Sequence, residues 1–484
     1  MTPDRLRAVL QGGVLALLVL APLPFGSVEP GAVLAIELTA AALGLGTILL
    51  LSRDFGTGTG LPNAPLAICV ALIALGMLQI VPIPFSIATR FSPTADLARA
   101  LIPHLGLDRP PAVSWSVAAP ETTDAVLRLV ADVLIGLTAA VAFDSERSRR
   151  RLAAALVTAA VFQAVYGSGE YLTGRQHIFG FAKKYDLDSA TGTFINRNHM
   201  ATMLAMALPF ALALAIGDPV PRRNASARSW RERVVGSANP RTVGRMLAFA
   251  ATALLWVGLL LSHSRAGLIA GVVASAVFIV RFRRIRGARW AAAIGAGVLL
   301  ALLSVETAQA PGERFFSLRN DVTVEAGRPA AWRDAMGLVA KRPAFGWGYG
   351  TFESIFPLVQ SAHTDLHYSH AHSDWLEWTI EGGVPVLGAA IALLVLALRG
   401  TRSTRRDTEI AATIPVACRA AIVAVALHAA WDFSLRIPSV AAAAAAVVGF
   451  ALTRPTDAVF PSGTSSAFSP APEARSDGRG ASVR

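Results

Sequence analysis

The chain has 484 residues, of which 54% are hydrophobic and only 16% are charged, and its mean hydropathy is +0.51. Soluble globular proteins carry about 25% charged residues. A chain of this length has too few charges to cover a water-facing surface, which argues against a soluble enzyme and against a disordered protein. We therefore expect an all-α, polytopic membrane protein.

The net charge of +12 comes from 44 basic and 32 acidic residues, a balance also found in nucleic-acid-binding proteins. Its distribution argues against that function. Twenty arginines and only four acids lie in four loops: 144–151, 217–245, 281–289 and 399–406. These loops carry more than the whole net charge, so the rest of the chain is net negative. Short basic loops of this kind set the orientation of a protein in the membrane. Because they account for the positive charge, we expect no nucleic-acid partner.

Twelve apolar stretches approach the roughly 20 residues needed to cross a membrane. The first follows Arg5 and Arg7 and resembles a signal peptide, but no convincing cleavage site follows it, so we expect it to be retained. The predicted spans lie near residues 8–25, 30–51, 64–83, 125–143, 152–169, 198–216, 246–262, 266–281, 290–307, 384–398, 411–430 and 437–453.

Twelve spans place all four basic loops on the same side as the N-terminus. Short arginine-rich loops prefer the cytoplasm, so both termini are predicted to be cytoplasmic. The longer loops 84–124, 170–197 and 308–383 then lie at the outer face, and the last is predicted to be partly helical.

The predicted organisation has three parts. Residues 1–150 hold the first four spans, and residues 151–453 hold spans five to twelve together with the long outer loop. Residues 454–484 are rich in Ser, Pro, Ala, Gly and Arg and are predicted to be a disordered cytoplasmic tail.

All nine histidines fall on or near the outer face, and four of them crowd into His363–His372. Outer loops are polar in any case, but histidine beside acids is suited to proton transfer near neutral pH. The segment from His370 to Gly383 leads into the tenth span. Ser373 is a candidate helix cap, and Gly382 with Gly383 would allow a bend.

Three acids in this segment, Asp374, Glu377 and Glu381, have the spacing of one helical face. A metal site is the alternative, since His363 and His367, or His370 and His372, have spacings that a metal can use. No His-Glu-x-x-His pattern is present, and neither cysteine has ligand spacing. The pattern favours a metal-free acid–base role, with no cofactor.

Four outer-face arginines differ from those in the basic loops: Arg197, Arg265, Arg328 and Arg333. An arginine at a membrane interface either snorkels to lipid headgroups or binds an anion, and its planar fork suits phosphate. Arg265 follows Ser262-His263-Ser264 in a tight turn between two spans, where polar groups need partners. For Arg265 we therefore favour a functional role.

Two further segments contain candidate residues. The glycine-rich stretch Arg342–Phe352 predicts a tight turn that presents Trp347 and Tyr349, as interface anchors or as a surface on which sugars stack. Between the last two spans, Asp432 and Arg436 are spaced as an i, i+4 pair.

Together these motifs resemble the bacterial O-antigen ligase and Wzy-type O-antigen polymerase superfamily of membrane glycosyltransferases. The resemblance rests on GTFINRNH, SHSRAG, RPAFGWGYGTF, HAHSDWLEWTIEGG and WDFSLRIP, and it extends from about residue 150 to 450. The number of spans and the long loop before the tenth span also agree. The first 150 residues match only in hydropathy.

The resemblance implies transfer of glycan from an undecaprenyl-diphosphate donor to an acceptor hydroxyl at the periplasmic face of the inner membrane, by an inverting, metal-independent reaction. The implied acceptor is lipid A–core, another lipid-linked glycan or a protein. Arg265 and Arg197 would bind the diphosphate, with help from Arg328 or Arg333. His370 or His372 would orient or deprotonate the acceptor hydroxyl, and Glu381 would orient that histidine or the loop. Asn198, His199, Trp347, Tyr349 and Asp374 would contact the acceptor or sugar.

A transporter or flippase of the same envelope-polysaccharide pathway is the alternative, and a non-catalytic assembly subunit is a third. A transporter places charged residues at mid-membrane depth. Here the spans are nearly free of acids apart from Glu37 and Asp132, and polar residues gather at one face. This distribution favours chemistry at the membrane surface, while ligase and polymerase stay equally open.

Overall fold

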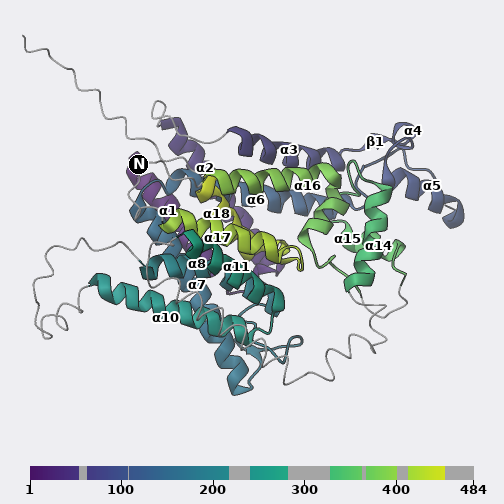
Figure 1. The fold of residues 1–484 in the computed structure, drawn as a ribbon. Helices are drawn as coiled ribbons and strands as arrows, with labels where there is room; N and C mark the ends of the chain where they lie inside the picture. The colour runs from purple at the N-terminus through teal and green to yellow at the C-terminus, as the bar shows by residue number, and fades with distance from the viewer. Residues whose placement is uncertain are drawn as a thin grey trace, which may run out of the picture.

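The computed structural model describes residues 1–53, 63–106, 108–216, 240–281, 328–361, 367–400 and 413–452. This part of the chain is almost entirely helical, as predicted, and forms a multi-pass helical bundle (Figure 1). Its strands form only two short antiparallel pairs. Residues Ile83–Pro84 (β1) pair with Ala112–Val113 (β2), and His177–Ile178 (β3) pair with Phe181–Ala182 (β4).

Eleven of the twelve predicted spans coincide with helices. They are α1 (Pro3–Leu20), α2 (Pro30–Arg53), α3 (Asn63–Ile80), α6 (Ala119–Ala142), α7 (Glu146–Thr173), α8 (Arg197–Ile216), α10 (Pro240–Leu261), α11 (Arg265–Arg281), α16 (Asp374–Gly400), α17 (Thr413–His428) and α18 (Pro438–Leu452). Seven of these are long and apolar enough to cross a membrane, and α11, α17 and α18 are shorter apolar helices. The span predicted at 290–307, the tail and His363 lie outside the described residues.

Helix α8 lies at the centre of the bundle, packed against α7, α10, α11 and α17. Most of its side chains are buried, and many are alanine or methionine, which lets neighbouring helices approach closely. Helices α6 and α18 approach more closely still, because Gly136 and Gly449 meet backbone to backbone with no room for a Cβ atom.

The candidate site residues gather at one end of the bundle, here called the site end. Helices α8, α11, α16 and α18 begin there, and α17 ends there, joined to α18 through the short turn η4 (Ser434–Arg436). The helices α14 (Arg328–Lys341), α15 (Phe352–Ile355), α4 (Phe85–Ala88) and α5 (Pro93–Leu105) lie beyond it, on the right in Figure 1.

Helix α16 bends at Gly383, whose φ of 77° is left-handed, as the glycine pair predicts. The bend frees two carbonyl oxygens. The Ile380 oxygen accepts a hydrogen bond from the Trp347 amide at 3.1 Å, and the Glu381 oxygen accepts one from the Gly348 amide at 3.0 Å. Gly346 lies so close to this bend that a Cβ atom would collide with the Glu381 backbone. The glycines of Arg342–Phe352 thus permit close backbone packing.

Candidate active site

The first turns of α16 supply three buried acids. Ser373 caps the helix, since its hydroxyl accepts a hydrogen bond from the Leu376 amide at 3.4 Å. Asp374, Glu377 and Glu381 then face the same way and are at most 2% exposed, as their spacing predicts. Buried carboxylates need partners. Asp374 Oδ2 accepts a hydrogen bond from the Leu435 amide at 3.1 Å, so the helix is tied to the turn between α17 and α18.

Arg436 bridges the other two acids. Its Nε lies 3.2 Å from Glu377 Oε1, and its Nη2 lies 2.5 Å from Glu381 Oε2. Burial alone would lower the pKa of Arg436, but the charges of Glu381 and Glu377 raise it above its ordinary value. The predicted pair between Asp432 and Arg436 is wrong, because the two acids on α16 hold the guanidinium instead.

His370 is fixed by Glu377. Its Nδ1 lies 3.0 Å from Glu377 Oε1, while Glu377 Oε2 accepts a hydrogen bond from the Ala371 amide at 2.9 Å. An ionised carboxylate can only accept hydrogen bonds, so Nδ1 of His370 must carry a proton. In the neutral imidazole, Nε2 then has a free lone pair. The His370 side chain is 30% exposed, whereas Glu377 is 2% exposed. This is the geometry of an oriented general base.

A second carboxylate, Asp432, lies among histidines. His372 Nδ1 is 3.7 Å from Asp432 Oδ1, His199 Nε2 is 3.8 Å from Oδ2, and the Ser434 hydroxyl donates to Oδ2 at 3.2 Å. Burial would raise the pKa of Asp432, but the nearby His372, His199 and His428 rings and Arg328 lower it below the ordinary value. Asp432 is therefore a carboxylate that stays ionised.

Phe433 joins these two groups. Its ring stacks on His370 with centroids 4.2 Å apart, and it meets His199 and His372 edge-on at 4.9 Å and 5.2 Å. One aromatic ring thus separates the His370–Glu377 pair from the His372–Asp432 pair. The sequence gives no sign of this contact, because Phe433 is simply an apolar residue that follows Asp432.

The two arginines predicted to bind diphosphate have different surroundings. Arg197 is already paired, since its Nε and Nη1 lie 3.5 Å from Asp186 and Asp188 respectively. Arg265 begins α11 with an exposed side chain, and among the described residues its guanidinium makes no ion pair. Its positive charge is therefore available to an anion.

The turn before Arg265 is linked to the histidines through the start of α8. The Ser264 hydroxyl donates a hydrogen bond of 2.7 Å to Asn198 Oδ1, and His199 next to it contacts Phe433. The predicted hydrogen-bond partners of this turn are therefore present. The structure brings Arg265, Asn198 and His199 to the same end of the bundle as His370.

Comparison with known families agrees with this geometry. Residues 250–391 match the family described as O-antigen ligase. The family that this segment matches is thus the one that the sequence motifs resemble. Among curated proteins, no relative matches the chain.

The segment that matches the O-antigen ligase family contains Arg265, Arg328, Arg333 and the residues from His370 to Glu381. Arg328, the first residue of α14, is exposed and donates a hydrogen bond of 2.9 Å to the Trp431 carbonyl beside Asp432. Arg333 is also exposed and makes no ion pair with any described residue. Arg197, His199, Asp432 and Arg436 complete the site from outside the matched segment.

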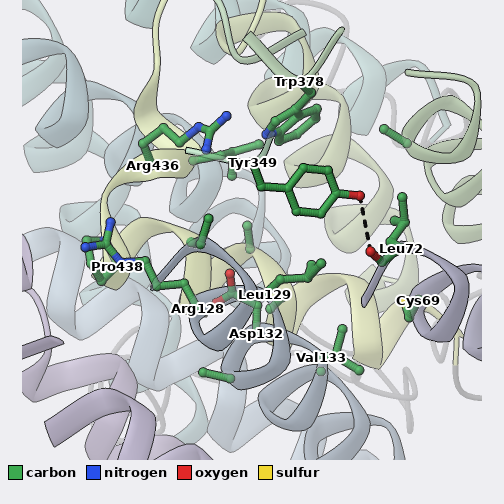
Figure 2. A pocket seen from close by; sticks show the side chains of 18 of the residues that line it. Cys69, Leu72, Arg128, Leu129, Asp132, Val133, Tyr349, Trp378, Arg436 and Pro438 are labelled. Carbon is green, nitrogen blue, oxygen red and sulfur yellow. Dashed lines mark hydrogen bonds between the residues drawn. The ribbon is translucent and has the colours of Figure 1, made fainter. Parts of the chain in front are cut away.

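The two aromatic residues of the glycine-rich turn are not presented to solvent. Trp347 is 7% exposed and donates from Nε1 to the Leu338 carbonyl at 3.0 Å. Tyr349 is 8% exposed, and its hydroxyl donates to the Leu72 carbonyl of α3 at 3.1 Å (Figure 2). Their rings pack inside the protein because the backbone of the turn lies on α16. Contact with a sugar stays a prediction for both.

The described residues contain no group of three or more His, Cys, Asp and Glu side chains placed to hold a metal. His367 instead pairs with Glu353 at 2.6 Å, and His363 is outside the described ranges. Metal-free chemistry stays a prediction.

Sequence reasoning missed how the acids are distributed. Glu381 was expected to orient a histidine or the loop. Glu377 is the acid that contacts His370, while Glu381 contacts Arg436 in the turn before α18. The i, i+7 spacing of His370 and Glu377 was available in the sequence, yet a histidine before a helix start cannot be placed from periodicity.

Proposed function

We propose that this protein is a membrane glycosyltransferase that moves a glycan from an undecaprenyl-diphosphate donor to an acceptor hydroxyl. The observation that carries the proposal is the His370–Glu377 pair, which leaves one ring nitrogen free, at the same end of the bundle as Arg265, whose guanidinium makes no ion pair with the residues that the structure describes. Both His370 and Arg265 lie in the segment that matches the O-antigen ligase family. We propose that this end faces the periplasm of a bacterial inner membrane, with both termini in the cytoplasm.

His370 is the base in this mechanism. Its Nε2 accepts the proton of the acceptor hydroxyl as the oxygen attacks the anomeric carbon of the donor sugar. Glu377 fixes the ring and stabilises the imidazolium that forms, and Arg436 holds Glu377 in place. His372 has a longer contact of 3.7 Å to its carboxylate, so it is the weaker candidate for the base.

The leaving group is the lipid diphosphate. As the new bond forms on the opposite face of the sugar, the bond from the anomeric carbon to the phosphate oxygen breaks, and its electron pair stays on the diphosphate. Arg265 stabilises this charge through its planar fork. Arg328 and Arg333 on α14 assist in this proposal, and Arg197 contributes less because Asp186 and Asp188 offset its charge.

In this mechanism one base is enough, because the leaving group needs no acid catalyst. Glycosidases need paired carboxylates because an alkoxide leaves poorly. A diphosphate leaves readily, so one base and an arginine site suffice, with inversion at the anomeric carbon and without a metal or other cofactor. The acceptor is lipid A–core, a lipid-linked glycan or a protein.

The test is the glycan profile of a strain lacking this protein. We expect lipid-linked glycan to accumulate and the envelope polysaccharide to be lost or shortened. Unligated glycan on the carrier would identify a ligase, and single repeat units on core would identify a polymerase. Wild-type profiles in the deletion strain, or full complementation by a variant lacking both His370 and His372, would contradict the proposal.

A further inference from the structure

A cavity of about 660 Å³ opens beside the His370–Glu377 pair, on the side of the bundle formed by α2, α3, α6, α16 and α18. Figure 2 shows Leu129 and Val133 of α6 facing Leu72 and Cys69 of α3, with Arg436 and Trp378 at the site end. Its walls are mostly apolar. A cavity of this size holds one ligand of moderate size, such as a single hydrocarbon chain with a small head.

Two acids and one arginine of the membrane spans line this cavity. Glu37 on α2 and Asp132 on α6 are the acids that stand out in otherwise apolar spans, and both line it, together with Arg128 one turn before Asp132. Asp132 lies about 20 Å along α6 from its first residue. Among the described residues, Glu37 and Asp132 make no hydrogen bond or ion pair. Acids at membrane depth are costly and are by default functional.

The cavity reaches the proposed base but not the proposed diphosphate site. His370, Glu377 and Glu381 are among its lining residues, whereas Arg197 and Arg265, on α8 and α11, are not. The His370 ring therefore lies between two different surroundings. A donor bound at Arg265 would approach it from one side, and a molecule in the cavity would approach it from the other.

The ionisable side chains that line the cavity indicate which class of molecule it can bind. Seven carboxylates line it, against the two guanidiniums of Arg128 and Arg436, and Arg436 is already paired with two of those acids. A diphosphate would be repelled there. Carboxylates accept hydrogen bonds, so this lining suits a head rich in hydroxyl groups, and the apolar walls suit a hydrocarbon tail.

We infer that this cavity is the acceptor site and that it takes an amphiphile with a hydroxyl-rich saccharide head and an apolar chain. Arg128 and Asp132 bind the head, and the chain lies along α3 and α6. This inference rests on the proposed function. The residues that would select the acceptor then lie in α3 and α6, outside the segment 250–391 that matches the O-antigen ligase family.

Cys69 provides a direct test, because it is half-buried and lines the cavity, whereas Cys418 is buried elsewhere. We would measure the rate at which N-phenylmaleimide labels the full chain in nanodiscs, with Cys69→Ser as the control for background. Dodecyl maltoside at ten times its Kd should slow the labelling of Cys69 about tenfold. Dodecyl phosphate, with the same chain and an anionic head, should protect much less. Equal protection by the phosphate, or none by the maltoside, would overturn the inference.

A matched pair of variants links the cavity to transfer. Val133→Trp fills the cavity from α6, whereas Leu127→Trp adds the same side chain on the exposed side of that helix. Because the new indole would occupy the acceptor site, Val133→Trp should transfer glycan at least about tenfold more slowly than wild type, whereas Leu127→Trp should transfer at the wild-type rate and be inhibited by dodecyl maltoside as wild type is. Equal transfer by all three would contradict the acceptor site while leaving the proposed function standing. If neither the wild type nor the variants transferred glycan, the proposed function would be wrong. The labelling of Cys69 would still show whether dodecyl maltoside binds in the cavity.

Discussion

The Nδ1 atom of His370 lies 3.0 Å from Oε1 of Glu377, and both oxygens of that carboxylate are occupied, one by the imidazole and one by the Ala371 amide. This arrangement fixes both the tautomer and the direction of the ring. It also explains why Arg436 is buried between Glu377 and Glu381, because the carboxylate needs a compensating charge to stay ionised in the protein interior.

The first prediction concerns this pair. His370→Ala should abolish transfer, and Glu377→Gln should lower kcat by about 10- to 100-fold, since an amide neither fixes the tautomer nor stabilises the imidazolium. His367→Ala removes an exposed histidine outside the site and should transfer at the wild-type rate. The measurement is glycan transfer by purified protein in vesicles. A wild-type kcat for Glu377→Gln would show that the pair is only structural.

The second prediction compares the arginines. Arg265→Ala should lower transfer by about 100- to 1,000-fold, as expected for loss of one stabilising donor in the transition state. Arg265→Lys should restore only part of this, because an ammonium cannot bind two phosphate oxygens as a fork. Arg197→Ala should cost less, since its charge is offset by two aspartates. Arg99→Ala, on the exposed surface of α5, is the control. A larger loss for Arg197 than for Arg265 would contradict these roles.

The third prediction concerns stability. Arg436→Ala leaves Glu377 and Glu381 buried without their shared cation, which should cost about 3–5 kcal/mol of folding free energy. A lower midpoint of thermal unfolding in detergent would show this. The triple variant Arg436→Met, Glu377→Gln, Glu381→Gln should regain stability without regaining transfer. An Arg436→Ala midpoint equal to wild type would mean that the ion pairs contribute nothing.

The fourth prediction is a pH dependence. The pKa of Asp432 is lowered in the folded protein, so its ionised form contributes stability that is fully present above the unfolded value near 4 and is lost as the pH falls through the folded value. The stability deficit of Asp432→Asn should therefore be constant from about pH 8 to 5 and shrink only below about pH 4. A deficit that disappeared between pH 7 and 5 would instead point to a titrating histidine.

A fifth prediction addresses metal. Transfer by membranes treated with a chelator should equal that of untreated membranes, because a base and an arginine site carry the reaction. Loss of activity that zinc restores would revive the histidine-metal alternative. His363→Ala separates that alternative from the acid–base role, since this residue belongs only to the proposed metal set.

Much of the fold follows from the sequence because membrane spans are long apolar segments whose positions depend on local composition. The bend at Gly383 and the cap at Ser373 also followed from single residues with well-defined roles. The buried face formed by Asp374, Glu377 and Glu381 followed from helical spacing, since side chains three, four or seven residues apart share one face.

Pairings between distant segments could not be obtained in this way. Arg436 and Glu381 are 55 residues apart, so only the packing of α16 against the turn before α18 decides that they meet. The sequence instead favoured the local pair with Asp432, which was wrong. The inward rings of Trp347 and Tyr349 were missed for the same reason. The glycines beside them bring the backbone against α16, a contact that no local pattern shows.

Glycan transfer in a reconstituted system tests the proposed roles of His370 and Arg265 most directly. Purified protein in vesicles would receive lipid-linked glycan extracted from the deletion strain, together with the acceptor lipids of the same membranes. We predict transfer by the wild-type protein, transfer lowered by about 100- to 1,000-fold for Arg265→Ala, and none by the double variant His370→Ala, His372→Ala, with all three equally folded and inserted. Full transfer by the double variant would contradict the assignment of this site.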